Sequence, residues 1–190
     1  MLRGVASACL IFFFVIPAHV SGSSKVTERA GSASKISAIA YTKAQIPKGQ
    51  LNVNTRPNEY FAAEILAFSS QRSTDAWSAG QATGNADVYP NYGDNRSAWA
   101  SQSADSQREF LILGYRTPSP INSVHIYETY NPGAVDTVSI RDASSGQWHM
   151  VWSGAASPAG NSARIFTVTF PETEFLVDAV RLAMNSPAVP

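Results

Sequence analysis

Side chains that commonly perform covalent chemistry are scarce in this sequence of 190 residues. Its one cysteine, Cys9, lies in an apolar segment close to the N-terminus. His125 and His149 lie in separate segments with strand character, whereas a zinc site needs three or four His or Cys ligands at suitable spacing. No Gly-x-Ser-x-Gly motif, which would place a serine nucleophile on a sharp turn, occurs in the sequence. The sequence therefore favours a protein that is not an enzyme, and a hydrolase with an unrecognised Ser-His-Asp site is only the third functional hypothesis.

Hard oxygen ligands form the better candidate for a metal site. Four such side chains lie within nine residues: Asp87, Asn91, Asp94 and Asn95. Ca²⁺ takes about six to eight oxygen ligands, and loop carbonyl groups can complete such a shell. The same residue types are turn formers, and Asp94 or Asn95 could instead cap local N–H groups without any metal. The sequence thus predicts either one structural Ca²⁺ ion or an ordinary turn, and thermal melting with and without a chelator separates the two.

Asn95 also begins the one Asn-x-Ser/Thr sequon of the chain without a central proline, Asn95-Arg96-Ser97. In a eukaryotic secretory route an exposed Asn95 could carry a glycan. A glycan on this side chain and a metal bond from it exclude one another, and mass spectrometry of the secreted protein would tell them apart.

Aromatic and polar side chains around two turns predict a carbohydrate-binding surface. Sugars bind where an aromatic ring offers an apolar face and a few polar groups fix the orientation of the ligand. The residues that could form such a surface are Tyr92, Arg96, Tyr130, Asn131 and Arg141. Glu128 is expected to pair with an arginine such as Arg141 at the surface. The alternative for aromatic residues is a place in the core, which is expected for Trp77, Trp99, Trp148 and Trp152.

The charge balance makes two classes of partner unfavourable. Fourteen basic residues balance fourteen acidic ones, and only 15% of residues are charged. Such a chain has no long-range field that favours nucleic acid or anionic lipid. The remaining partners are a carbohydrate or an extracellular protein.

Residues 1–22 have the features of a signal peptide. Arg3 provides a basic start, Val5–Ile16 is apolar or small throughout, and Pro17 ends the run. This run is shorter than the roughly 20 apolar residues that a transmembrane helix needs. We therefore predict a secreted, extracellular protein, with an uncleaved N-terminal anchor as the alternative. Cleavage near Gly22 would leave a mature chain without cysteine and hence without disulfides.

The rest of the chain divides into an arm and one domain. Residues 23–58 are rich in Ser, Ala and Lys with weak periodicity, which indicates a flexible linker or a loosely docked arm. Residues 59–190 contain short β-prone runs separated by Gly, Pro, Asn and Ser, as in a sandwich or barrel. The predicted strands are Phe61–Ser69, Trp99–Ser101, Glu109–Tyr115, Ile121–Tyr130, Val135–Arg141, Trp148–Trp152, Arg164–Phe170 and Val177–Met184. A single helical turn is predicted at Ala79–Thr83, between Ser78 as N-cap and Gly84 as the C-terminal stop.

Several ordered blocks of residues carry a family resemblance. WSAGQATG at residues 77–84 resembles the turn that opens discoidin-like domains, and the series continues through residues 87–95, 98–101, 126–135 and 148–154. Together the blocks resemble a divergent galactose-binding-like (coagulation factor type C-like) family, a subgroup also seen in F-box leucine-rich-repeat proteins. The resemblance implies an all-β fold, an antiparallel jelly-roll β-sandwich, in which loops at one end bind a ligand without catalysis.

In this family a closing strand follows a segment like Asn185–Pro190, where this sequence ends. The resemblance therefore implies either a longer natural chain or a sandwich that lacks its last strand, whose open edge could take a strand from another chain. The leading hypothesis is a secreted, non-catalytic module that binds a carbohydrate or another cell-surface ligand through the loops at 87–97 and 130–135. The second hypothesis is a protein–protein assembly or adhesion module.

Overall fold

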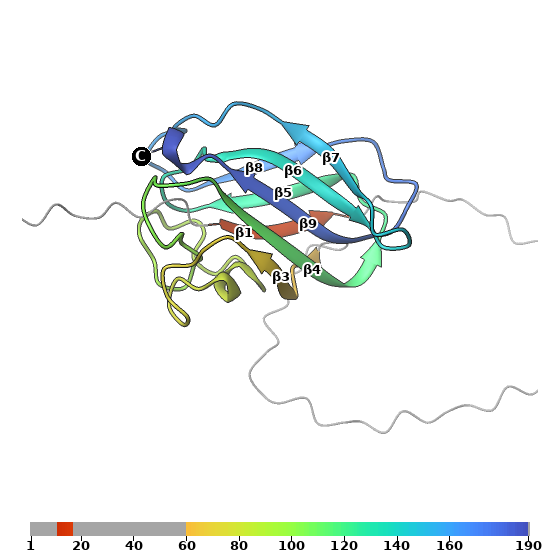
Figure 1. Ribbon diagram of the computed structural model, residues 1–190, viewed down its shortest axis with the longest axis horizontal. Coiled ribbons are helices and arrows are strands. Elements are labelled where there is room, and N and C mark those ends of the chain that lie inside the picture. The colour runs from red at the N-terminus through yellow and green to blue at the C-terminus, as the bar shows by residue number, and fades with distance from the viewer. Residues whose placement is uncertain (1–10, 17–59, 190) are drawn as a thin grey trace, which may run out of the picture.

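The computed structural model describes residues 11–16 and 60–189 of the chain, and their regular secondary structure is almost entirely β-strand (Figure 1). The strands are β1 (Ile11–Ile16), β2 (Tyr60–Phe61), β3 (Glu64–Phe68), β4 (Glu109–Ser119), β5 (Ser123–Glu128), β6 (Val135–Asp142), β7 (Trp148–Ser153), β8 (Arg164–Thr169) and β9 (Val177–Met184). Two short 3-10 helices, η1 (Ala79–Ala82) and η2 (Ser186–Ala188), complete the described elements.

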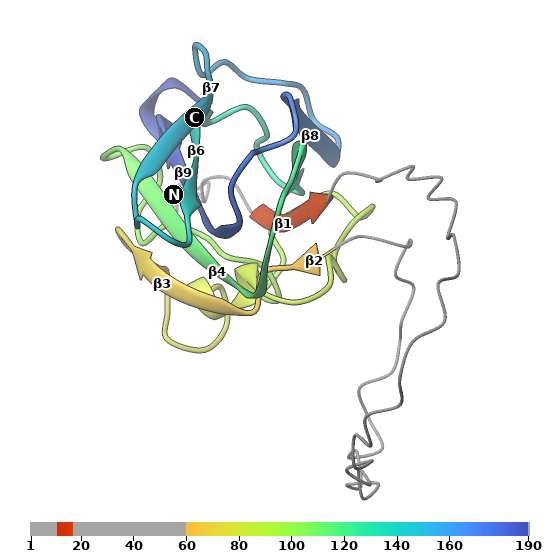
Figure 2. The same cartoon turned by 90° about the vertical axis from the view of Figure 1, so that its right-hand side faces the viewer.

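The strands form two antiparallel sheets that pack face to face. One sheet has the order β2-β1-β5-β8 and the other the order β3-β4-β9-β6-β7. Figure 2 shows the strands of the two sheets as separate layers on either side of the molecule. The core is filled by fully buried side chains of both sheets, among them Leu111, Leu113, Ile126, Ile140 and Leu182. The predicted antiparallel jelly-roll β-sandwich is confirmed.

A β-bulge explains how β6 can bury both Val135 and Val138, which are three positions apart. Val135, Val138 and Ile140 are all buried, although side chains alternate between the two faces of a regular strand. The register with β9 shifts between Val135 and Thr137, so one extra residue is inserted there. Because of this insertion, Val135 and Val138 face the same core.

Every predicted strand is confirmed except Trp99–Ser101, and the first one is divided into β2 and β3. The segment at Trp99 is buried but is not a strand, because its backbone groups form hydrogen bonds with loop residues instead of with a neighbouring strand. The N–H of Arg72 donates to the carbonyl of Ala100 at 2.9 Å, and the N–H of Ala100 donates to the carbonyl of Trp77 at 3.2 Å. Trp99 itself is 1% exposed and donates from Nε1 to the carbonyl of Ser70 at 3.0 Å.

The predicted helical turn is present as η1, and Gly84 follows it with a φ of +78°. Ser78 stands at the N-cap position but makes no side-chain capping bond. The N–H of Ala79 instead donates to Oε1 of Gln71 at 2.9 Å. The capping role predicted for Ser78 is therefore wrong in its chemistry, because a side chain from the preceding loop performs it.

The predicted targeting segment enters the described structure only as β1, a strand of the four-stranded sheet. The other residues of 1–22, and the predicted arm at 23–58, lie outside the described residues. Signal-peptide cleavage and the nature of the arm stay predictions. Among the described residues, no helix has the length and apolar character needed to cross a bilayer.

Candidate ligand-binding face

Two loops predicted to bind a ligand meet at the end of the sandwich where β5 finishes. The N–H of Gly93 donates to the carbonyl of Thr129 at 3.0 Å, which joins the loop at 87–97 to the end of β5. Five residues gather around this contact, and we name them the tyrosine face: Tyr89, Tyr92, Tyr127, Tyr130 and Asn131. The rings of Tyr92 and Tyr130 have centroids 5.5 Å apart, and those of Tyr89 and Tyr127 are 5.2 Å apart in an edge-to-face arrangement. Such pairs are favourable because the ring edge is positive and the ring face negative.

A small second core holds the tyrosine face in place. Val88, Ala98 and Ala100 are buried together, and Trp77, Ala86, Tyr127 and Tyr130 pack against them. Tyr127 and Tyr130 therefore have one side in this small core. Tyr92 is the outermost ring of the face, with 38% of its surface exposed.

The polar atoms of the face come from Tyr92 and Asn131. The hydroxyl of Tyr92 lies 3.5 Å from Oδ1 of Asn131, which is at the long limit of a hydrogen bond. Asn131 has a φ of +43°, a left-handed conformation that asparagine tolerates better than most residues. The turn thus presents an amide group beside two aromatic rings, and a ligand hydroxyl could replace the long contact between them.

Glu128 fixes the loop at 130–135 from inside the molecule. Its side chain is 0% exposed, and Oε1 accepts the N–H of Gly133 at 2.8 Å. Oε2 accepts Nε of Arg164 on β8 at 2.5 Å. The expected surface pair with Arg141 is therefore wrong, because Glu128 points inward and its cation comes from the adjacent strand.

Asp94 holds a second polar cluster next to the tyrosine face. Oδ2 accepts a hydrogen bond from Nη1 of Arg72 at 2.8 Å, and Oδ1 accepts one from Nε1 of Trp77 at 2.6 Å. The guanidinium of Arg72 also lies over the ring of Trp77, 4.3 Å from its centroid. Both oxygens of the carboxylate therefore have protein donors, and Arg72 is a member of this cluster that no sequence pattern indicated.

These contacts bear on the predicted calcium site. Asp94 is engaged as described, and Oδ1 of Asn95 accepts the N–H of Ser97 at 2.9 Å, as in an Asx turn. Asp87 and Asn91 are exposed in the same loop. The described residues contain no group of three or more His, Cys, Asp or Glu side chains that could hold a metal ion. The arrangement favours the turn alternative for Asp94 and Asn95, and the Ca²⁺ ion stays a prediction.

The five predicted ligand-binding residues divide into two groups. Tyr92, Tyr130 and Asn131 lie together, and Arg96 is exposed in the same loop, where its carbonyl accepts the N–H of Trp77. Arg141 lies near the opposite end of β6, roughly 20 Å along the strand at about 3.3 Å per residue. It forms a bidentate pair with Asp178 at 2.8 and 3.1 Å, and this hydrogen bonding raises the pKa of Arg141. The structure does not bring Arg141 to the tyrosine face.

Of the four tryptophans expected in the core, only Trp99 is fully buried. Trp152 is half-buried and packs edge-to-face on Phe166 at 4.9 Å. Trp77 and Trp148 are half-buried beneath arginines, the second with the guanidinium of Arg141 5.7 Å from a ring centroid. The core prediction thus holds in full for one of these side chains.

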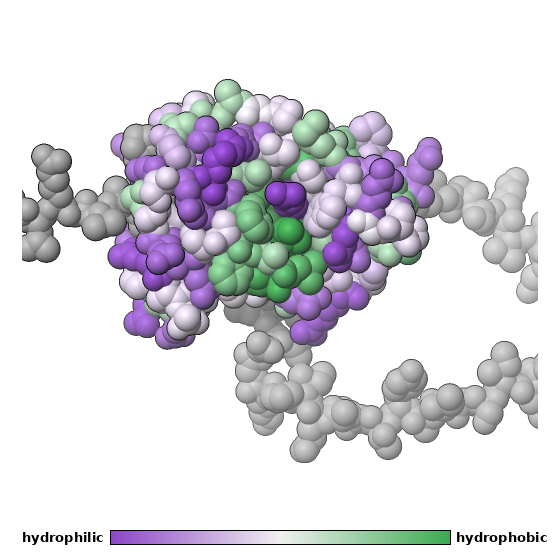
Figure 3. Space-filling model, in the orientation of Figure 1, coloured by the Kyte–Doolittle hydropathy of each residue, from purple (hydrophilic) through white to green (hydrophobic). Residues whose placement is uncertain are grey.

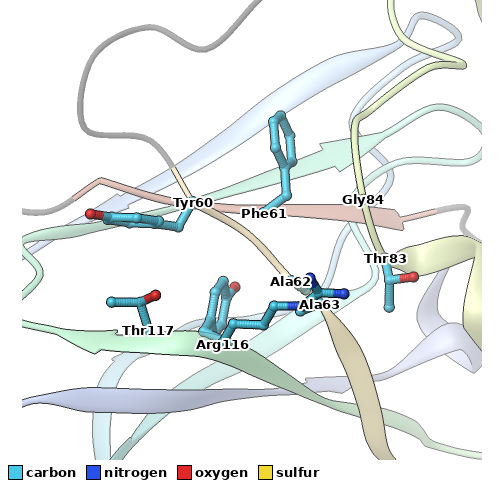
Figure 4. Close-up of a pocket in the computed structure, with 9 residues that line it drawn as sticks. Tyr60, Phe61, Ala62, Ala63, Thr83, Gly84, Arg116 and Thr117 are labelled. Atoms are coloured by element: carbon cyan, nitrogen blue, oxygen red, sulfur yellow. The ribbon is translucent and has the colours of Figure 1, made fainter. Parts of the chain in front are cut away.

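Two hollows lie away from the tyrosine face. One, of about 490 Å³, lies between β2, the end of η1 and the end of β4, and Figure 4 shows Tyr60, Thr83 and Arg116 around it. The other, of about 510 Å³, lies beside β7, where His149 stacks on Phe175 with ring centroids 4.6 Å apart. Neither hollow gathers the residues predicted to bind a ligand, so the tyrosine face is the candidate site.

Comparison with known proteins places this site in a family. Residues 52–154, just over half of the chain, match the family described as "Pappalysin-1, SD scarf domain, C-terminal". The chain belongs to this family. The SD scarf match covers the whole tyrosine face, whereas Arg164, the partner of Glu128, lies beyond it. It is a different family from the discoidin-like one, and the discoidin resemblance stays a prediction.

The other comparisons add one similar structure. No curated protein matches the chain. The NMR solution structure of the N-terminal domain of the single-strand break repair protein XRCC1 is similar, with a TM-score of 0.49 and 16% sequence identity. The similarity covers 69% of this chain and 90% of that chain.

Proposed function

We propose that this SD scarf family member is a secreted, non-catalytic binding module that recognises a carbohydrate through the tyrosine face. The observation that carries the proposal is the meeting of Tyr92, Tyr130 and Asn131 from two separate loops. Secretion is supported by the signal-like pattern of residues 1–22. The Tyr92 hydroxyl contacts the amide oxygen of Asn131, which is not a base. A nucleophilic hydroxyl would need a base as its partner, so this contact supports a role in binding.

A sugar suits this surface for reasons of shape and polarity. Tyr92 exposes 38% of its surface, enough for the ring to stack on the apolar face of a pyranose. Asn131 can both donate to and accept from sugar hydroxyls. The loops are held by the buried Glu128 and by the small core under Tyr130, so little ordering is needed when a ligand binds.

An extracellular protein is the second candidate ligand, and a separate surface favours it. Figure 3 shows an apolar patch on the outer face of the five-stranded sheet, over β3 and β4. Leu66 and Phe68 of β3 are each 40% exposed. Edge strands with exposed apolar residues are prone to association with other chains.

A glycan array with four proteins tests the proposal. The wild type should bind a defined set of glycans, and Tyr92→Ala should lose at least about tenfold in affinity because a stacking ring is removed. Tyr92→Phe keeps the ring and should retain most of the binding. Tyr60→Ala removes an equally exposed tyrosine, 39% against 38%, outside the tyrosine face and should bind as the wild type does. No glycan binding by the wild type, or equal loss in Tyr60→Ala and Tyr92→Ala, would refute the sugar site.

A further inference from the structure

The four-stranded sheet has one strand from a distant part of the chain. β1 lies between β2 and β5 and pairs antiparallel with β5 at six positions, from Ile11 opposite Glu128 to Ile16 opposite Ser123. It pairs with β2 at two positions. In Figure 2, β1 is the strand between β2 and the rest of its sheet. The position between β2 and β5 therefore accepts an apolar strand of six residues.

The same six residues form the C-terminal half of the apolar run Val5–Ile16 that predicts a signal peptide. Cleavage near Gly22 would remove them, so one molecule cannot both lose its signal peptide and keep β1. Without β1, the N–H and C=O groups of β5 on that side have no ladder partner. Val124 and Ile126 of β5 are 0% exposed in the complete sandwich, and a missing neighbour would uncover the core beside them.

We propose that, in the secreted protein, the position between β2 and β5 is a strand-acceptor site that binds an extended apolar strand of a second polypeptide, antiparallel to β5. The proposal rests on the secretion part of the proposed function and not on sugar binding. β1 itself shows that such a strand fits, because it occupies this position with an unbroken register to β5. Strand addition of this kind obtains affinity from main-chain hydrogen bonds and specificity from alternate side chains.

The surroundings of the site define the chemistry of the partner strand. Its positions opposite Val124 and Ile126 must be apolar, since those side chains face the core. The positions opposite His125 and Tyr127 are on the other face of the sheet, where both side chains are half-buried, so a polar residue there stays outside the main core. The described strands β3 to β9 of a second copy are poor donors, because each of them is already paired within its own sheet.

The experiment uses the full chain expressed in a secreting host and the protein purified from the medium. Mass spectrometry of its N-terminus first shows whether residues 11–16 have been removed. The probe is a synthetic peptide of Ile11–Ile16 with two lysines added at each end for solubility. Hydrogen exchange of the Ser123–Glu128 amides is then measured with and without the peptide. Those amides that β8 does not protect should exchange rapidly in the cleaved protein, and at least about tenfold more slowly with saturating peptide.

Two matched peptides test the alternation of faces. Phe13→Lys with Val15→Lys places charges opposite Ile126 and Val124, and this peptide should bind at least about 100-fold more weakly than the parent. Phe12→Lys with Phe14→Lys has the same charge but places it opposite Tyr127 and His125, on the face of the sheet that is turned away from the main core. That peptide should lose less affinity than the first and stay within about tenfold of the parent, since no charge enters the main core.

Three results would overturn the acceptor site. The first is a secreted protein that retains residues 11–16, because its own strand then fills the position. The second is slow exchange of the β5 amides in the cleaved protein without peptide. The third is equal affinity of the two lysine-substituted peptides. Tyr92-dependent glycan binding is measured on the array with its own matched variants, so failure of the acceptor site and failure of the sugar site are distinguished by separate measurements.

Discussion

Gly133 offers the sharpest test of how the tyrosine face is built. Its φ is +118°, a region that L side chains rarely adopt, and a Cβ at this position would lie 1.9 Å from the carbonyl oxygen of Ser157. The obstacle is backbone and cannot rotate away. The unfavourable backbone conformation costs about 1–2 kcal/mol, and forcing an atom into a packed site costs about 1–3 kcal/mol more. We expect Gly133→Ala to reduce the free energy of unfolding by about 2–5 kcal/mol.

Gly146 provides the control for this prediction. It also has a positive φ, +72°, but a Cβ at this position would have no atom within 4 Å, so only the backbone cost of about 1–2 kcal/mol applies. Urea denaturation of the wild type and the two variants gives both free energies, and the midpoint of Gly133→Ala should lie roughly 1 M below that of Gly146→Ala. Equal midpoints would refute the close approach of Ser157 to the loop at 130–135.

Three further substitutions test side-chain contacts in the interior and at the surface. Glu128→Gln keeps an acceptor for the adjoining loop but removes the charge that pairs with Arg164, which is partly exposed, so urea denaturation should show a loss of about 1–3 kcal/mol. Trp99→Phe removes a buried donor and part of a ring, and the same measurement should show a loss of about 2–3 kcal/mol. Hydrogen bonds from Ser145 and Ser144 lower the pKa of Asp142 from 3.8 to about 2. The ionised carboxylate therefore stabilises the fold fully at pH values above 3.8, and this stabilisation is lost as the pH falls through about 2. Asp142→Asn should therefore flatten the dependence of the thermal midpoint on pH between about 4 and 2.

The strands could be predicted because local patterns determine them. In β8, Phe166 and Val168 alternate with the exposed residues Ile165 and Thr167, and this period of two is visible in the sequence. Trp99 shows the limit of that reasoning. Its neighbourhood has the composition of a strand, but a strand forms only where the backbone can pair with another strand. Here the backbone of Ala100 forms hydrogen bonds with Arg72 and Trp77 in loops instead.

The candidate site was partly predictable for a related reason. Turn chemistry placed Tyr92, Tyr130 and Asn131 in loops, and the fold brought those loops together. The partners of Glu128 and Arg141 depend on strand order and on which face each side chain occupies. A single sequence gives neither the strand order nor the face of each side chain. Arg164 therefore could not be selected, among the arginines of the chain, as the partner of Glu128.

The two proposed sites meet at Glu128. This residue lies opposite Ile11 at the start of the strand-acceptor site, and its carboxylate holds Gly133 in the loop that carries Tyr130 and Asn131. An empty acceptor site would leave the β1 side of β5 without a neighbouring strand, and the bonds of Glu128 to Gly133 and Arg164 would then hold the loop without that support. A partner strand that orders β5 would steady the same anchor and reduce the small amount of ordering that still accompanies ligand binding. Coupling between two sites is reciprocal, so a sugar bound at the tyrosine face would strengthen strand binding by the same factor.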